Sequence, residues 1–319
     1  MMVKLEDVAK KAGVSLTTAS RVINRKGYLS SNTIQKVEDA IAELHYTPNA
    51  AARSLQGKSL KLIGLVFPNI QNIFYAELIE KIEQELFKKG YKSMLALTEH
   101  DKQKERDYLS LLLSNQVEGI IYGSHNLSPD EYSSIQAPIV AFDRLLTPET
   151  TVVGPDNFQG GLLAAEALIQ TGSKKIAFFG STDNPFSITN LRREGFLSSL
   201  ETRGLEASVL NFSSSLTVTR KSAQIKQTLL EHQFDGIFCT DDLMALLVKN
   251  IAQELHQEPY VIGFDGTEFI QNYETSLTTI KQPISDLAEL LVELLLKKIA
   301  GETLAHSYQL PVKLHIGEL

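Results

Sequence analysis

The sequence predicts an α/β protein: a small all-α helix-turn-helix headpiece followed by two doubly wound parallel-sheet subdomains. Short helical patterns fill the first 47 residues, whereas short apolar runs alternate with amphipathic helical segments from Leu62 onward. Continuous apolar runs between helices are typical of parallel strands that are covered on both faces. The strand–helix order occurs twice along the chain, which predicts two sheets with a cleft between them.

The headpiece is predicted from two helical patterns, over residues 5–12 and 16–24, on either side of a tight turn. Gly13 permits that turn, and Ser15 is a good N-cap for the second helix. A third helix is expected after Ser30, ending near Leu44. Three short helices with this turn form a helix-turn-helix. The expected inner faces consist of Val8, Ala9, Ala12, Ala19, Val22, Ile23, Ile34, Val37, Ile41 and Leu44.

Residues 48–58 form a short segment with helical character after the headpiece, which we place at residues 1–47. Asn49 is suited to cap a helix, three alanines favour the helix, and Gly57 is suited to end it. A helix of about six residues is marginal alone in water. We therefore expect it to form only when two copies pair on DNA.

The apolar runs of the body set the predicted strands and subdomains. A Leu-rich helix is expected over residues 285–300, with its leucine stripe in the subdomain core, and a final strand near Tyr308–His315 crosses back between the halves. One subdomain would comprise residues 61–156 and 283–307, the other 157–282 and 308–319. The strands are predicted at 62–67, 93–97, 119–123, 138–142, 175–180, 236–240 and 261–264.

The charge of the chain is distributed unevenly. Residues 1–60 hold nine Lys and Arg against five Asp and Glu, a net charge of +4, whereas the remainder carries −11 of the total of −7. A small basic head on a large acidic body is suited to a head that binds a polyanion. This distribution favours nucleic acid as the partner of the headpiece.

Composition also bears on the compartment. The 319 residues contain no run of eighteen apolar residues and no apolar signal peptide. The one cysteine, Cys239, cannot form an internal disulfide, which fits a reducing compartment. We expect a cytoplasmic protein without a membrane segment.

Polar residues follow the predicted strands at their carboxyl ends, where doubly wound folds bind ligands. Carboxylates near the aromatic rings of Phe74 and Tyr75 suit the hydroxyls and apolar faces of a sugar. The polar residues at these strand ends are Ser124, His125, Asp143, Arg144, Asp241, Asp242 and Asp265.

The headpiece resembles the lactose-repressor family through LEDVAKKAGVSLTTASRVIN and LHYTPNAAARSLQGKS. The resemblance implies that the second helix enters the major groove, with Leu16, Thr17 and Arg21 at base edges. It also implies that the hinge helix binds the minor groove, where Leu55 would wedge between base steps. Ser15, Thr18, Ser20 and Asn24 suit phosphates, and Asn49 and Arg53 belong to the expected hinge contacts.

The body resembles the same family, most closely its sucrose-operon repressors, through GLVFPNIQNIFYAELIE, VEGIIYGSHN, PIVAFDR, GFDGTEF and LTTIKQP. That implies a periplasmic-binding-protein-like fold, a homodimer on a pseudo-palindromic operator, and release by a sugar or sugar phosphate. Because no heptad tail follows the last strand, we expect a dimer, and we expect neither cofactor nor metal. The implied effector pocket consists of Phe74, Tyr75, Asp143, Arg192, Asp241, Asp265 and Gln282, to which strand-end position adds Ser124 and Arg144.

Other functions and other roles for these residues stay open at this point. A global carbon-catabolite regulator belongs to the same family, and the pair Asp241–Asp242 permits a glycosidase reading. A secreted sugar-binding protein would share the body fold but lack the headpiece. Among single residues, Asp242 is expected to cap a helix, Arg192 has surface acids Asp183 and Glu194 as alternative partners, and Phe74 has a place in the core as its alternative. The effector could be sucrose, a phosphorylated sucrose, fructose or its phosphate.

Overall fold

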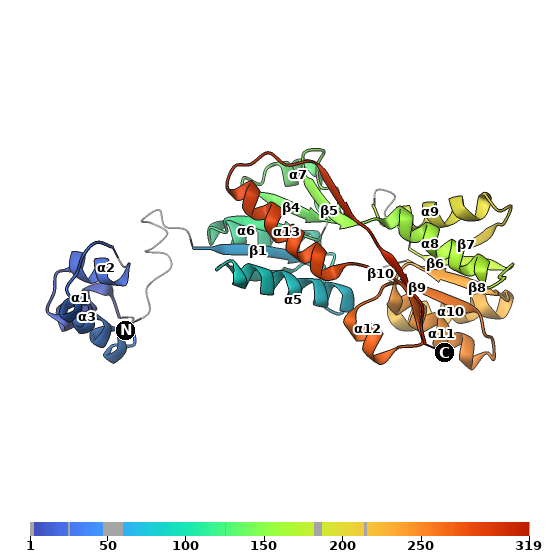
Figure 1. Ribbon diagram of the computed structural model, residues 1–319, viewed down its shortest axis with the longest axis horizontal. Helices are drawn as coiled ribbons and strands as arrows, with labels where there is room; N and C mark the ends of the chain where they lie inside the picture. The colour runs from blue at the N-terminus through green and yellow to red at the C-terminus, as the bar shows by residue number, and fades with distance from the viewer. Residues whose placement is uncertain are drawn as a thin grey trace. The chain divides into compact units, whose positions relative to one another are not determined.

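The computed structural model describes residues 3–24, 26–46, 60–124, 126–181, 187–213 and 216–318. The chain divides into two compact units, residues 1–60 and residues 61–319 (Figure 1). The hinge segment predicted at residues 48–58 lies outside the described residues. None of the helices in the described ranges is both long and apolar enough to cross a membrane.

The first unit consists of three helices: α1 (Leu5–Ala12), α2 (Leu16–Ile23) and α3 (Ser31–Glu43). Gly13 ends α1 with a positive φ of 66°, a conformation that glycine adopts without strain. The Ser15 hydroxyl caps α2 by accepting a hydrogen bond from the Thr18 N–H at 3.1 Å. The helix-turn-helix predicted from the sequence is confirmed, with helix ends within one residue of expectation.

The core of this unit is built from small side chains, which lets three short helices pack closely. Val8, Ala9, Ala19, Val22, Val37 and Ala40 are buried in it. Ile23 was expected on this inner face, but it is only partly buried and lies outside the cluster. Val22 already fills the position one turn after Ala19, and the next residue projects about 100° further round the helix.

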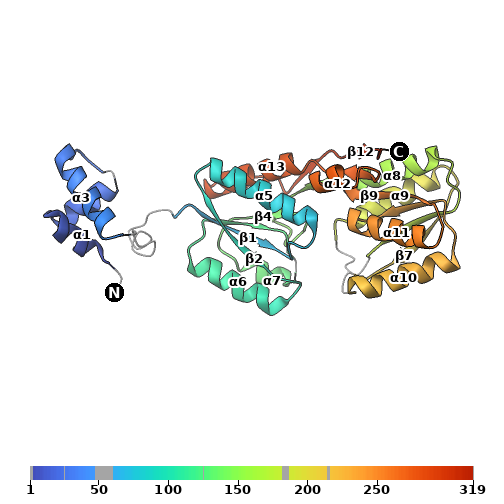
Figure 2. The same cartoon turned by 90° about the horizontal axis from the view of Figure 1, so that it is seen from below.

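The second unit holds two six-stranded sheets. The first has the strand order β11-β5-β4-β3-β1-β2, with every pairing parallel. Helices α5 and α13 cover one face of it, and α6 and α7 cover the other (Figure 2). The elements are β1 (Leu62–Phe67), α5 (Ile73–Lys88), β2 (Lys92–Leu97), α6 (Lys102–Ser114), β3 (Gly119–Tyr122), α7 (Pro129–Ser133), β4 (Ile139–Phe142), β5 (Thr151–Pro155), α13 (Ile284–Ile299) and β11 (Ser307–Leu310).

The second sheet has the order β12-β10-β9-β8-β6-β7, and only β12 is antiparallel to its neighbour. Helices α8 and α9 pack on one face, whereas α10, α11 and α12 pack on the other. The elements are α8 (Asn157–Gln170), β6 (Ile176–Gly180), α9 (Asn190–Glu201), β7 (Ala207–Asn211), α10 (Val218–Glu231), β8 (Gly236–Cys239), α11 (Asp242–Glu254), β9 (Tyr260–Asp265), α12 (Glu268–Tyr273), β10 (Thr278–Lys281) and β12 (Lys313–His315).

The expected final strand is two strands. β11 pairs with β5 in the first sheet, and β12 pairs with β10 in the second. Residues 308–310 therefore lie with the first subdomain and not, as the sequence suggested, with the second. Pro311 separates the two strands, because proline has no N–H to donate to a ladder.

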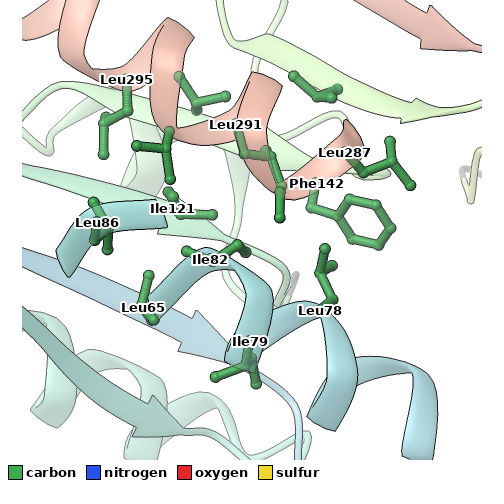
Figure 3. Packing of buried hydrophobic residues seen from close by; sticks show 14 of the residues in the cluster. Leu65, Leu78, Ile79, Ile82, Leu86, Ile121, Phe142, Leu287, Leu291 and Leu295 are labelled. Carbon is green, nitrogen blue, oxygen red and sulfur yellow. The ribbon is translucent and has the colours of Figure 1, made fainter. Parts of the chain in front are cut away.

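The predicted leucine stripe is confirmed as core. Leu287, Leu291 and Leu295 of α13 are fully buried against α5 and the first sheet (Figure 3). They meet Leu78 and Ile82 of α5, so the two helices share one apolar layer. This layer gives the first subdomain a single rigid core on the face that carries α5.

The chain passes between the two subdomains three times: between β5 and α8, between β10 and α13, and between β11 and β12. At the first crossing, the Asp156 N–H donates to the Leu310 carbonyl at 2.8 Å, which ties it to the third. At the second crossing, the Gln282 N–H donates to the Asp265 carbonyl at 2.9 Å. Three adjacent connections of this kind permit the subdomains to change their arrangement without unfolding.

Close contact between α8 and α9 requires glycine. A Cβ placed on Gly195 would lie 2.1 Å from the Phe158 carbonyl oxygen, and one on Gly161 would lie 2.1 Å from the Arg192 carbonyl oxygen. Because the obstacle in both cases is backbone, the helices would have to separate to admit a side chain. That separation would also displace Arg192.

We therefore expect Gly195→Ala to lower the free energy of unfolding by roughly 1–3 kcal/mol, as overpacking does. At an exposed helix position, Gly→Ala raises the free energy of unfolding by about 1 kcal/mol. The sign of the change therefore distinguishes a tightly packed glycine from an exposed one. Urea denaturation followed by circular dichroism measures it. Glu194→Ala, at the exposed neighbouring position, is the control and should change stability by less than about 0.5 kcal/mol. A neutral or stabilising Gly195→Ala would contradict this packing.

Candidate DNA-binding and effector sites

The second helix of the headpiece presents an exposed face that differs from its buried one. Ala19 and Val22 face the core, whereas Leu16, Thr17 and Arg21 are exposed, Leu16 to 46%. An exposed leucine, a threonine methyl and a guanidinium on one helix supply apolar and hydrogen-bonding groups for base edges. The structure places these three predicted residues where a groove could reach them.

Arg21 makes only a weak internal contact. Its Nε donates to the Lys26 carbonyl at 3.4 Å, and both groups are exposed. The guanidinium lies against Gly27, where a Cβ would come within 2.4 Å of its Nη2. A long, exposed hydrogen bond of this kind holds the Arg21 guanidinium only weakly.

The four residues predicted to contact phosphates occur as two pairs at the ends of α2. Ser15 and Thr18 join their hydroxyls at 2.8 Å at the start of the helix. Asn24 Nδ2 donates to the Ser20 carbonyl at 2.7 Å at its end. Each pair therefore stabilises a helix terminus within the chain. Asn49, Arg53 and Leu55, the predicted hinge contacts, lie outside the described residues.

Asp265 and Gln282 form the centre of the candidate effector site. Asp265 ends β9 with a φ of 130°, and Asp143, after β4, has a φ of 49°. Such conformations cost of order 1–3 kcal/mol in L-residues and are frequent at functional sites. Gln282 Nε2 donates to Asp265 Oδ1 at 2.7 Å, whereas the buried Gln282 Oε1 has no partner among the described residues. Gln282 therefore has one acceptor left for a ligand.

Arg192 of α9 is the buried cation of this site. Its Nε donates to Asn157 Oδ1 at 2.7 Å, and its Nη1 donates to the Thr240 carbonyl at 2.6 Å and lies 3.9 Å from Asp265 Oδ1. The guanidinium stacks 3.6 Å above the centre of the Phe264 ring. Arg192 is therefore not a surface residue paired with Glu194, and Asp183 lies outside the described residues.

Asn157 connects the two halves of the site. Its Nδ2 donates to the buried Asp143 at 2.8 Å, while its Oδ1 accepts from Arg192. Asp143 follows a strand of the first subdomain, and Arg192 belongs to the second. A continuous polar chain therefore runs from Asp143 through Asn157 and Arg192 to Asp265.

Burial controls the protonation of these acids. Burial raises the pKa of Asp265 well above its ordinary value, and the nearby Arg192 opposes that shift. Burial likewise raises the pKa of Asp143, opposed by Arg144 and then Arg192. A buried carboxylate is stabilised by every donor that reaches it. The hydroxyls of a sugar are such donors, so this arrangement favours a polyhydroxylated ligand.

Arg144 lies next to Asp143 and also reaches both subdomains. Its Nη2 donates to the Tyr75 hydroxyl at 3.4 Å, and its Nη1 donates to Ser187 Oγ at 3.1 Å. The buried Nε has no partner among the described residues. Arg144 thus keeps a buried donor for a further acceptor.

Two predicted pocket residues have structural contacts elsewhere. Phe74 is 4% exposed and packs in the core against Phe142, with ring centres 5.6 Å apart, which fits its alternative role as core. Ser124 is fully buried and bonds to Thr98 Oγ1 at 2.7 Å and Glu105 Oε2 at 2.9 Å. Neither is joined to the polar chain by a recorded contact. His125 lies outside the described residues.

The helix cap predicted for Asp242 is made by Asp241 instead, so the capping prediction is wrong by one residue. Asp241 caps α11 by accepting from the Met244 N–H at 2.8 Å. Asp242 is the first residue of the helix and is fully buried, where it accepts from the Gly266 N–H at 2.7 Å and from Thr279 Oγ1 at 2.5 Å. An N-cap residue lies just before the first residue of its helix. A cap at Asp242 would require α11 to begin at Leu243, but α11 begins at Asp242.

The sequence reasoning missed two groups. Asn157 was overlooked because the strand before it, β5, was not predicted. The buried carboxylate of Glu105 accepts hydrogen bonds from Tyr122, Tyr132, Ser124 and Asn126. Its position was detectable, because Glu105, Leu109 and Leu112 share one helical stripe. In the described part of the chain, no cluster of His, Cys, Asp or Glu could hold a metal ion.

Family models match both units. Residues 4–49 match the model for bacterial regulatory proteins of the lacI family. Residues 61–286 match the model for periplasmic binding proteins and the sugar binding domain of the LacI family. The second match alone covers more than half of the chain.

Relatives and solved structures agree with these matches. The chain is 67% identical over 316 residues to a sucrose operon repressor of Lactococcus lactis subsp. lactis, covering 99% of each chain. A lac repressor dimer bound to operator and an anti-inducer superposes with a TM-score of 0.85 at 27% identity, covering 98% of both chains. A regulator from Alkaliphilus metalliredigens complexed with D-xylulofuranose superposes with a TM-score of 0.71 at 34% identity, covering 81% of this chain and 98% of the regulator.

These relatives are regulators rather than enzymes, and the headpiece excludes the reading as a secreted binding protein. The helix-turn-helix, the two-sheet body and the matches over both units lead to one conclusion. The chain belongs to the LacI family of bacterial regulatory proteins.

Proposed function

We propose that this protein represses a sucrose operon by binding a pseudo-palindromic operator as a homodimer, and that a sugar bound between its subdomains releases it. The observation that carries the proposal is the polar chain from Asp143 to Asp265. It joins both subdomains, and both of its terminal carboxyl groups are buried and can accept hydrogen bonds from a ligand. The identity of 67% to a sucrose operon repressor over the whole chain supports the choice of operon. Such a protein works where bacterial DNA is, in the cytoplasm.

DNA recognition rests on the exposed face of α2. Arg21 would donate two hydrogen bonds to a guanine, while Leu16 and the Thr17 methyl would contact thymine methyls. The hinge segment at residues 48–58 would form its helix on DNA and insert Leu55 into the minor groove. A wedge in each of two copies requires that the hinges lie close together, which makes operator binding sensitive to the arrangement of the bodies.

Pairing of two copies is supported by apolar side chains on the second subdomain. Leu243 of α11 and Phe269 and Tyr273 of α12 are exposed, and the last two rings stack with centres 4.9 Å apart. Exposed apolar groups of this size mark contact surfaces. We propose that they contribute to a twofold interface, the symmetry that a pseudo-palindrome requires.

The two arginines of the site differ in what they could bind. Arg192 already donates to Asn157 and the Thr240 carbonyl and faces Asp265. Arg144 has a buried Nε without a partner in the described structure. If the effector carries a phosphate, we propose that Arg144 binds it and that Asp265 and Gln282 bind sugar hydroxyls.

The switch would work through the subdomain arrangement. Over nearly its whole length the chain superposes on an operator-bound lac repressor, which supports assigning this arrangement to the operator-binding state. A sugar that binds another arrangement more tightly would draw the hinges apart, and a short hinge helix does not persist alone. A differential affinity of about 1–3 kcal/mol is sufficient for such coupling.

Arg21→Ala should weaken binding to the operator by about 1–3 kcal/mol and relax preference at one base position. The probe is a duplex that the protein itself selects from a randomised pool, followed by fluorescence anisotropy. Lys36→Ala, which removes one exposed charge from α3, is the control and should reduce affinity for all DNA alike. An equal loss for Arg21→Ala on selected and random duplexes would exclude base reading.

Asp265→Asn should give a repressor that binds the selected duplex normally but is no longer released by sugar. The change replaces a carboxyl oxygen beside Gln282 and Arg192 with an amide, and a buried polar group left without a partner costs about 1–3 kcal/mol. Calorimetry with sucrose, phosphorylated sucrose, fructose and fructose phosphate measures the loss. Glu258→Gln, at an exposed position, is the control. Full inducibility of Asp265→Asn would show that the pocket lies elsewhere.

Arg144→Ala should weaken the binding of phosphorylated sugars by about 1.5–3 kcal/mol and that of the neutral sugars far less. Tyr75→Phe is the matched control, because it removes a hydrogen-bond partner of Arg144 but keeps the guanidinium. The same calorimetric panel compares the two variants. A similar loss for neutral and phosphorylated sugars would contradict the phosphate role.

A further inference from the structure

Glu268, the first residue of α12, contacts the other subdomain twice. Its Oε1 accepts from Lys81 Nζ at 2.9 Å, and its backbone N–H donates to Glu77 Oε2 at 2.8 Å. Lys81 and Glu77 lie one turn apart on α5 of the first subdomain. We call Glu77, Lys81 and Glu268 the latch, because they join the two subdomains outside the polar chain described above.

The electrostatics of the latch favour its closed form. The hydrogen bond from Lys81 lowers the pKa of Glu268 and raises that of Lys81. Burial raises the pKa of Glu77, and the backbone N–H of Glu268 opposes that shift. Lys81 is therefore the stronger of two cations that act on both carboxylates, the other being Lys281, and its loss would leave the repulsion between Glu77 and Glu268 less well balanced.

A short, well-held turn connects the latch to the sugar site. It runs from Asp265 through Gly266 and Thr267 to Glu268. The Gly266 N–H donates to the buried Asp242 at 2.7 Å, and the Gly266 carbonyl accepts from Gln271 Nε2 at 2.5 Å. Gly266 has a φ of 61°, and a Cβ there would lie 2.8 Å from the Lys281 backbone.

These contacts hold both peptide groups of Gly266, so Asp265 and Glu268 are connected by a turn with little conformational freedom. A displacement of Asp265 toward a ligand is carried three residues along the turn. A cavity of about 200 Å³, lined by Glu77, Glu268 and Gln282 among others, leaves room for the movement.

We propose that the latch stabilises the operator-binding arrangement and that the turn from Asp265 to Glu268 transmits sugar binding to it. The proposal rests on the sugar site proposed above. A sugar that bonds to Asp265 shifts the turn, separates Glu268 from Lys81 and Glu77, and frees the subdomains to rearrange. The latch then sets how much sugar is needed for release.

Charge reversal tests the latch. Lys81→Glu and Glu268→Lys should each weaken binding to the self-selected duplex about two- to fivefold, the range of partly exposed ion pairs. Each should also lower the sugar concentration at which half of the DNA is released, by a similar factor. The sugars tested are fructose, sucrose and their phosphates. The double variant Lys81→Glu/Glu268→Lys re-forms the pair and should return both values to within twofold of the unmodified protein.

Lys226→Glu is the matched control. It breaks the Lys226–Glu254 pair, which has a length of 3.1 Å and lies within the second subdomain. Its glutamate is as exposed as Glu268, whereas its lysine is more exposed than Lys81. It should change neither DNA affinity nor release. The proposal is overturned if the single latch variants behave like this control, if they tighten DNA binding, or if the double variant fails to restore the unmodified values.

Hydrogen exchange separates failure of the latch from failure of the proposed function. If the unmodified protein binds no duplex or responds to no sugar, the proposed function fails. The latch is still tested, because Lys81→Glu should then speed exchange in peptides from α5 and α12, and the double variant should slow it again. Unchanged exchange in Lys81→Glu would overturn the latch as well.

Discussion

The buried guanidinium of Arg192 is the group on which the arrangement of the two subdomains depends. Removing such an ion from water costs several kcal/mol unless its donors are satisfied. Here the partners come from three places: Asn157 at the first crossing, the carbonyl of Thr240 after β8, and Asp265 at the end of β9. Each of these positions depends on where a strand ends or where the chain crosses. The fold therefore brings the charge and its partners together, and they in turn tie the crossings to one another.

Because the polar groups at the crossings hold the two subdomains in one arrangement, a small ligand that binds these groups could favour a different arrangement. The carboxyl groups of Asp143 and Asp265 are buried, and burial raises the pKa of both. Gln282 and Arg144 retain unpartnered buried atoms among the described residues. A sugar offers hydroxyls that satisfy donors and acceptors alike, so it changes which arrangement pairs these groups best. We propose that the headpiece amplifies a small preference, because a hinge helix of about six residues, as predicted from the sequence, is marginal alone in water.

The sequence was sufficient for elements with a strong pattern. The helix-turn-helix and the seven predicted strands were recovered because helical spacing and continuous apolar runs report burial directly. β5, β7 and β10 were missed for different reasons. β7 is an edge strand with exposed side chains, and β10 reads TTIK, which lacks a continuous apolar run. β5 ends in Gly154–Pro155, a pair typical of turns. Missing β5 hid Asn157, the link in the polar chain.

Residue roles were harder to predict than elements, because they depend on distances between remote segments. The family resemblance implied that Asp265, Gln282 and Arg192 line one pocket, and the structure brings them into contact with one another. Asp241 caps α11 in place of Asp242. A shift of one residue in the start of a helix decides which side chain caps it. The latch has no local signal, because Lys81 and Glu268 are 187 positions apart and read as ordinary surface charges.

Linkage between the two ligands tests the central claim most directly. One equilibrium between two arrangements would govern both sites. A sugar that lowers the affinity of the protein for its operator must then have a lower affinity for the operator-bound protein than for the free protein, and the two factors must be equal. Calorimetry of the effective sugar into the free protein and into the protein saturated with its selected duplex gives that factor. The account predicts a factor equal to the loss of DNA affinity measured by anisotropy at saturating sugar. Equal sugar affinities in the free and DNA-bound protein would contradict it.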